Sequence, residues 1–208
     1  MSRSRSSRVT KLNPNLTGAG VDLMDFDDSI LYNDYLTSGT AIRVGPNAPD
    51  LAELRDGIYL YGFAGDGVIV EEGMFTLHFL HDIHPDFTPT FHVHWTHNNA
   101  SPSGNVKWQI DYTYSHGYSA GTYGAPSTLS VTQAAGAQYT HHITDDDSMP
   151  VPVDFEPDGM LLCRIYRDPA DAADTFADDA FLIGVDLHYR VGQIATYERN
   201  RPFTSAGF

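Results

Sequence analysis

The sequence predicts an all-β fold: an antiparallel β-sandwich, jelly-roll-like, with an extended irregular N-terminal arm. From residue 57 onward, short runs of alternating apolar and polar residues are separated by Gly, Pro, Asn and Asp, which is the pattern of strands and turns. No convincing amphipathic helix interrupts these runs, and aspartate, which favours turns over helices, outnumbers glutamate. Eight or nine strands in about 135 residues suit a sandwich or jelly roll and disfavour a parallel α/β fold.

Residues 1–56 are expected to form the arm. The first eleven residues contain no acidic side chain and form a basic tip, whose cations are Arg3, Arg5, Arg8 and Lys11. Such a tip is either a solvated terminus or an arm that docks on an acidic neighbour, for example another copy of the chain. In residues 12–56, Gly and Pro interrupt any sustained period. About 45 residues are long for a loop, so these residues are better explained as an arm laid over the domain or a neighbouring subunit.

Residues 57–192 are expected to form the sandwich, and residues 193–208 a C-terminal tail. The predicted strands are 58–63, 68–71, 74–80, 90–96, 106–115, 128–132, 138–144, 160–167 and 180–191. Between the first two, Gly65-Asp66-Gly67 reads as a hairpin turn. Alternation in 106–115 assigns one face to the core, formed by Val106, Trp108, Ile110, Tyr112 and Tyr114. The same reasoning in 180–191 assigns to the core Phe181, Ile183, Val185, Leu187 and Tyr189.

Composition excludes several classes of protein. A formal net charge of −15, from 27 acidic and 12 basic residues, argues against direct binding of nucleic acid, because phosphate contacts need a basic surface. No apolar run approaches the roughly 18 residues of a membrane span, and the N-terminus lacks the apolar stretch of a secretory signal. A disulfide framework is impossible within one chain because Cys163 is the single cysteine, and it reads as a small buried strand residue.

The histidines carry the strongest candidate chemistry. Most of them fall in one stretch, at His78, His81, His84, His92, His94 and His97. Strand alternation in 91–95 places His92 and His94 together on the face opposite the core. Two imidazoles at i and i+2 can chelate a divalent ion, as in jelly-roll metalloenzymes of the cupin type.

A cupin-type site also needs a carboxylate soon after the pair, and no Glu occurs between Glu72 and Glu156. A later histidine ligand would have to come from His141, His142 or His188, and the spacing selects none of them. The alternatives are a catalytic metal, a structural metal or pH-sensitive contact, and ordinary hydrogen-bonded strand histidines. The last is favoured, so no cofactor is expected.

Other enzyme signatures are absent from the sequence. It contains no Gly-x-Ser-x-Gly elbow and no phosphate-binding glycine loop. The Asp-rich stretches 145–147 and 168–179 do not follow the calcium loop of an EF-hand and read as solvated acidic loops.

In the glycine-rich stretch 117–124, Tyr118 and Tyr123 are candidates for an interface, since turn aromatics are not needed for the core.

Three segments together resemble a family of small proteins encoded by tailed bacteriophages. The segments are Asp82-Ile83-His84-Pro85 followed by His92-Val93-His94-Trp95; Ser103-Gly104-Asn105-Val106-Lys107-Trp108 with Asp111-Tyr112; and Leu162-Cys163-Arg164-Ile165-Tyr166-Arg167-Asp168 with Asp186-Leu187-His188-Tyr189. In that family a DIHPH-x-HW signature precedes a GNV-x-W strand and a CR-x-x-RD strand. Here residues 86–91 separate the two halves of the first signature, and the resemblance covers roughly residues 58–191.

This resemblance implies a virion structural protein, not an enzyme, and the expected function is a capsid cement or decoration protein. Its expected partners are the major capsid protein or other virion proteins, and a homotrimer at a local threefold axis is the preferred assembly. The expected location is the capsid surface, after synthesis in the host cytoplasm, with no membrane partner. Two alternatives stay open: a neck, tail or receptor-binding β-module, and a cupin-like metal-dependent enzyme using His92 and His94.

Overall fold

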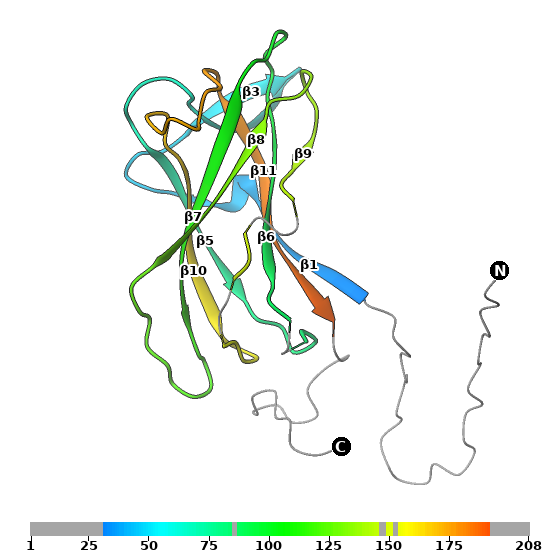
Figure 1. Cartoon of the computed structure of the whole chain (residues 1–208), viewed down its shortest axis with the longest axis vertical. Coiled ribbons are helices and arrows are strands. Elements are labelled where there is room, and N and C mark those ends of the chain that lie inside the picture. The colour runs from blue at the N-terminus through cyan, green and yellow to red at the C-terminus, as the bar shows by residue number, and fades with distance from the viewer. Residues whose placement is uncertain (1–30, 85–86, 146–148, 152–153, 192–208) are drawn as a thin grey trace, which may run out of the picture.

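The computed structural model describes residues 31–84, 87–145, 149–151 and 154–191 (Figure 1). These residues form two antiparallel sheets, one of them strongly curled, and the described chain has no α-helix. The all-β prediction is therefore confirmed.

The two sheets contain six and five strands. In the six-stranded sheet the order is β3 (Asp50–Arg55), β4 (Ile58–Phe63), β11 (Ala180–Val191), β6 (Thr90–Thr96) and β9 (His142–Ile143), and β1 (Leu31–Ser38) also pairs with β11. In the five-stranded sheet the order is β2 (Arg43–Val44), β5 (Glu71–His78), β10 (Met160–Arg167), β7 (Asn105–Ser115) and β8 (Ser127–Ala134). A short 3-10 turn, Gly39–Ala41, lies between β1 and β2.

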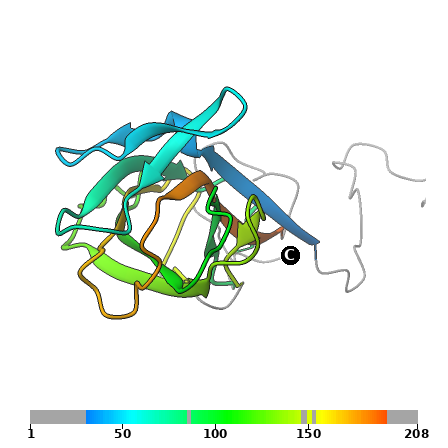
Figure 2. The same cartoon turned by 90° about the horizontal axis from the view of Figure 1, so that it is seen from above.

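The connectivity is that of a jelly roll. Four pairs are nested one inside another along the chain: β4 with β11, β5 with β10, β6 with β9, and β7 with β8. Such nesting describes one long antiparallel hairpin that is rolled up, and the pairs β11–β6 and β10–β7 close the roll. Seen from above, the strands curl around a common interior (Figure 2). The jelly-roll-like prediction holds.

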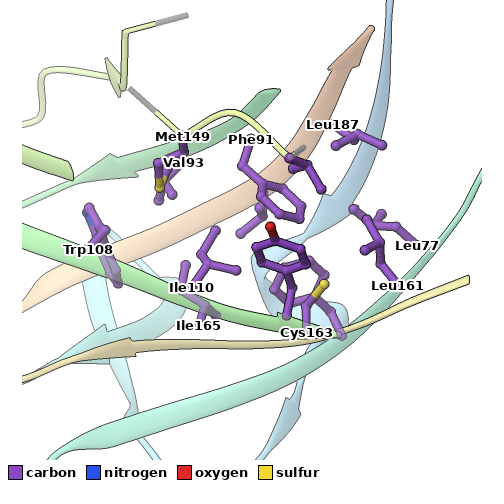
Figure 3. Close-up of a cluster of buried hydrophobic side chains, with 14 of the residues drawn as sticks. Leu77, Phe91, Val93, Trp108, Ile110, Met149, Leu161, Cys163, Ile165 and Leu187 are labelled. Atoms are coloured by element: carbon purple, nitrogen blue, oxygen red, sulfur yellow. The ribbon is translucent and has the colours of Figure 1, made fainter. Parts of the chain in front are cut away.

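The interior of the roll is filled with apolar side chains from both sheets (Figure 3). In β7, Val106, Trp108 and Ile110 have no exposed surface, Tyr112 is also buried, and Tyr114 is partly buried against the core. The alternate residues from Asn105 to Thr113 are only partly buried. The predicted core face of this strand is confirmed, because side chains in a regular strand point alternately to opposite faces. Cys163 is buried in the same core, as predicted.

A β-bulge changes the phase of β11. Leu182 pairs with Trp95 and Gly184 pairs with the neighbouring His94, so Ile183 is an extra residue in the strand. Leu182 therefore faces the core before the bulge, and Val185, Leu187 and Tyr189 face it afterwards. The predicted inward positions were right for the last three residues. They were wrong for Ile183, which is only partly buried. Phe181 is buried as predicted, but it lies outside the main core cluster.

Residues 31–56 belong to the sandwich, so the prediction of an irregular arm up to residue 56 was wrong for this part. All eight residues of β1 pair with β11, β2 pairs with β5, and β3 forms a hairpin with β4. The sequence did not reveal β1, because its stabilising partner strand lies at the other end of the domain. Residues 1–30, including Arg3, Arg5, Arg8 and Lys11, and the predicted tail 193–208 lie outside the described residues.

Two other local predictions need correction. Residues 68–70 are not in a strand, and β5 is a single strand that starts at Glu71. Gly65-Asp66-Gly67 is not a hairpin turn, because β4 and β5 lie in different sheets and the segment crosses between them. Of the predicted strand 138–144, only His142–Ile143 is a strand, although the backbone N–H groups of Tyr139 and Thr144 also donate to His97 and Val93.

Candidate functional site

His92 and His94 project from β6 on the outer face of the six-stranded sheet. The alternate residues Phe91, Val93 and Trp95 have no exposed surface and form part of the core, as alternation predicted. The histidines meet polar side chains from two other strands and one loop. This histidine–carboxylate cluster consists of Asp34 on β1, His92 and His94 on β6, Asp186 and His188 on β11, and His141 just before β9.

Asp186 joins the two histidines of β6. It lies directly opposite His92 in the β6–β11 pairing. One carboxylate oxygen, Oδ2, is 2.8 Å from Nε2 of His94, and the other, Oδ1, is 3.4 Å from Nδ1 of His92. Asp186 is buried, so these contacts offset the cost of removing a carboxylate from water. The carboxylate that the histidine pair contacts thus comes from β11, a strand distant in the sequence.

Three neighbouring side chains contact the imidazole ring of His188. Its Nδ1 lies 2.6 Å from Oδ1 of Asp34, which sits directly opposite on β1. One face of its ring stacks on Tyr32 at a centroid distance of 4.7 Å, and it also stacks on His92 at 5.0 Å. The imidazole plane of His188 is therefore fixed by packing as well as by hydrogen bonding.

His141 extends the cluster toward β9. Its Nε2 is 2.9 Å from Nδ1 of His94. Burial, and then the nearby His94, lower the pKa of His141, which favours its neutral form at pH 7. Because Nε2 of His94 faces a carboxylate and donates to it, Nδ1 of His94 is placed to accept a hydrogen bond from His141.

Of the three later histidines that the sequence left open, two join the cluster and one does not. His188 contacts His92, and His141 contacts His94. His142 instead stacks on Trp95 at 4.3 Å and accepts a hydrogen bond from the backbone N–H of Gly136. Burial, followed by the neighbouring His97 and His141, lowers the pKa of His142.

Asp34, His92 and His188 each place one potential metal-ligating atom within 4.8 Å of those of the other two. The cluster contains imidazoles and carboxylates, so it can exchange protons or bind a metal ion, and its members include no serine or cysteine nucleophile. The pairing of His92 with His94, predicted as the metal pair, is mediated by the carboxylate of Asp186.

Tyr118 and Tyr123 lie on the loop between β7 and β8, and both side chains are over 40% exposed. The buried carboxylate of Glu156 holds this loop by accepting hydrogen bonds from the backbone N–H groups of Tyr118 and Ser119, at 2.9 and 3.1 Å. Burial alone would raise the pKa of Glu156, but these N–H groups, the Ser119 hydroxyl and His116 together lower it. The role of the tyrosines as an interface stays a prediction.

A separate hollow on the described surface lies away from this cluster. It has a volume of about 700 Å³ and lies against the five-stranded sheet, where its lining includes Met74, Thr76, Leu162 and Arg164. Arg164 is paired with Glu72 and Asp111. Its charge is thus already balanced, and the hollow contains no member of the histidine–carboxylate cluster.

The described chain contains no helix long and apolar enough to cross a membrane. Comparisons with protein-family models, curated proteins and solved structures found no match. The resemblance to the bacteriophage family therefore rests on the sequence motifs alone.

Proposed function

We propose that this chain is a non-enzymatic structural protein of a bacteriophage particle, a capsid cement or decoration protein that bridges major capsid subunits. The observation that carries the proposal is a closed, apolar-filled jelly roll with exposed apolar side chains on an edge hairpin. A filled interior provides rigidity, and an exposed apolar edge favours association with another protein.

The edge hairpin consists of β3 and β4. Leu51, Ile58 and Tyr59 on it are each at least half exposed. Leu51 lies opposite Tyr61, whose side chain packs against the core, so the apolar face of the hairpin continues outward from the sandwich. β3 ends the sheet order, and its outer edge has no strand partner among the described residues. An edge strand of this kind can pair with another chain.

Two further exposed apolar residues lie in the connection between β4 and β5. Val68 and Ile69 follow β4, and Val68 is 84% exposed. Burying such surface is worth about 25 cal/mol per Å² before the costs of association. A partner that covers the exposed apolar residues of the hairpin would therefore gain more than one that covers a polar face.

The charge distribution of the sequence supports a bridging role. The first eleven residues are basic, whereas the chain as a whole has a net charge of −15. A basic tip favours an acidic neighbour, including a second copy of this chain, through attraction that salt screens. A homotrimer at the capsid surface remains the proposed assembly.

The test is to compare hairpin variants in two assays, light scattering after size-exclusion chromatography and co-sedimentation with phage shells. The double variant Leu51→Asp, Tyr59→Ser should lose both self-association and shell binding while its circular dichroism stays unchanged. Ser130→Asp, on the exposed part of β8, is the matched control and should retain both. The proposal fails if the wild-type protein is monomeric and does not bind shells, or if the control and the double variant behave alike.

The basic tip has its own test. Deleting residues 1–11 should weaken assembly at low ionic strength, and the difference from the full chain should shrink as salt is added. Equal shell binding by both proteins at low salt would show that the tip does not contribute.

A receptor-binding or glycan-binding module is a second candidate, favoured by the exposed Tyr118 and Tyr123 on a loop that Glu156 anchors. Binding to host cells or to a glycan array that disappears in a Tyr118→Ala, Tyr123→Ala variant would support it. The cupin-like enzyme is less well supported, because His92 and His94 face away from the interior of the roll.

A further inference from the structure

We propose that Asp34, His92 and His188 bind one divalent transition-metal ion, with Zn²⁺ as the best match, and that this ion fastens β1 to the sandwich. This site differs from the pair His92 and His94, and it requires no particular assembly of the protein.

The three residues come from three strands that lie side by side. β11 carries His188 and pairs with β1 on one side and with β6 on the other. Asp34 is directly opposite His188, and His92 is on the far side of β11, where it stacks on His188. An ion held by all three would cross-link β1, β11 and β6, although β1 is separated from β11 by most of the domain sequence.

The distances fit a site that needs only side-chain adjustment. One ligand atom from each residue lies within 4.8 Å of the other two. Zinc ligands lie about 2.0 to 2.2 Å from the ion, which places the ligand atoms roughly 3.3 Å from one another in a tetrahedral site. Asp34 is more than half exposed, so its carboxylate has room to rotate toward the ion, and the bond to the ion would replace its hydrogen bond to Nδ1 of His188. Solvent can supply the remaining ligand on this open side.

The surrounding residues orient the imidazoles as in known metal sites. Nδ1 of His92 faces the carboxylate of Asp186, which His94 holds from the other side. A carboxylate behind a histidine fixes its tautomer, makes it a better metal ligand and leaves Nε2 to bind the ion. Stacking on Tyr32 fixes the ring of His188. The cluster thus provides both the ligands and the residues that hold them.

The ligand set selects the type of ion. Two imidazoles and one carboxylate suit Zn²⁺ and neighbouring first-row transition ions, whereas Ca²⁺ and Mg²⁺ prefer sites built from oxygen atoms alone. We therefore expect Zn²⁺ to raise the melting temperature of the protein and Mg²⁺ and Ca²⁺ to leave it unchanged.

The test titrates the full chain, first stripped with a chelator, with ZnCl₂ in a calorimeter. We expect one ion per chain and binding at least about tenfold weaker in Asp34→Asn and in His188→Gln. His141→Gln is the matched control, because it removes a histidine of the same cluster that is not a proposed ligand. Asp34→Asn changes an exposed side chain, so its fold, checked by circular dichroism, should be intact.

A second measurement tests the cross-link itself. Hydrogen exchange of the β1 backbone amides should slow when Zn²⁺ is added to the wild-type protein and should not change in Asp34→Asn. The proposal is overturned if the wild-type protein binds no zinc at millimolar concentrations, or if all variants bind it equally, which would indicate adventitious binding to surface histidines. It is also overturned if only His141→Gln loses the ion, because the ligands would then be His94 and His141.

Discussion

Arg167 and Asp174 form a bidentate ion pair with both side chains fully buried. Nε of Arg167 lies 2.8 Å from Oδ2 of Asp174, and Nη2 lies 2.7 Å from Oδ1. The guanidinium also donates to backbone carbonyls of Phe63, Asp178 and Phe176. The arginine thus joins the end of β10 to β4 and to the acidic connection before β11. At Asp174 this connection is therefore a structural element and not a solvated loop.

Removing one partner of this pair should be strongly destabilising. Asp174→Ala leaves a buried guanidinium without its carboxylate, so the free energy of unfolding should fall by about 3 to 5 kcal/mol. Chemical denaturation at pH 7 measures the change. The control is Arg55→Ala, which removes an exposed pair with Asp56 and should cost less than about 1 kcal/mol. Similar losses in the two variants would contradict this role for the buried pair.

The contribution of Glu156 to the stability of the protein should depend on pH, because its carboxylate holds the loop that carries Tyr118 and Tyr123. Its pKa in the folded protein is lower than the ordinary 4.5, so its contribution is fully present above that value and is lost as the pH falls through the lowered pKa. Glu156→Gln should cost about 1 to 3 kcal/mol at pH 7 and clearly less at pH 3. Urea unfolding of both proteins at the two pH values tests this, and a loss independent of pH would argue against a charged Glu156 as the anchor.

Cys163 should be unreactive in the folded protein. Burial raises the pKa of its thiol and prevents access of reagents, and the thiolate is the reactive form. A thiol-specific chromogenic reagent at pH 8 should label the native chain at least about a hundredfold more slowly than the chain in guanidinium chloride. Rapid labelling of the native protein would show that the core around this residue opens readily.

Gly104 should not tolerate a side chain. Its φ is 98°, and an added Cβ would collide with the backbone carbonyl oxygen of Thr175. Gly104→Ala should therefore lower the free energy of unfolding by more than about 1 kcal/mol. Gly124→Ala is the matched control, since nothing lies within 4 Å of its Cβ position, and it should change stability by less than about 0.5 kcal/mol. Thermal unfolding compares the two, and equal melting temperatures would contradict the clash.

The class of fold, most of the strands and the two faces of the regular strands could be predicted from the amino-acid sequence. The period-two pattern in β7 identified Trp108 as a core residue, and the same pattern in β6 identified the outward pair His92 and His94. These are local properties, because the backbone of a regular strand sends successive side chains to opposite faces wherever the strand is later placed. The predictions for β6 and β7 therefore required no knowledge of the neighbouring strands.

The order of the strands in each sheet and the side chains that share a site could not be predicted in this way and were found from the folded protein. Asp186 is 92 residues from His94, and Asp34 is 154 residues from His188. The sequence around each of these histidines therefore did not indicate which carboxylate it contacts. The bulge at Ile183 and the pairing of β1 with β11 were hidden for the same reason. Such features depend on hydrogen bonds and packing between distant segments, which form only when the whole jelly roll closes.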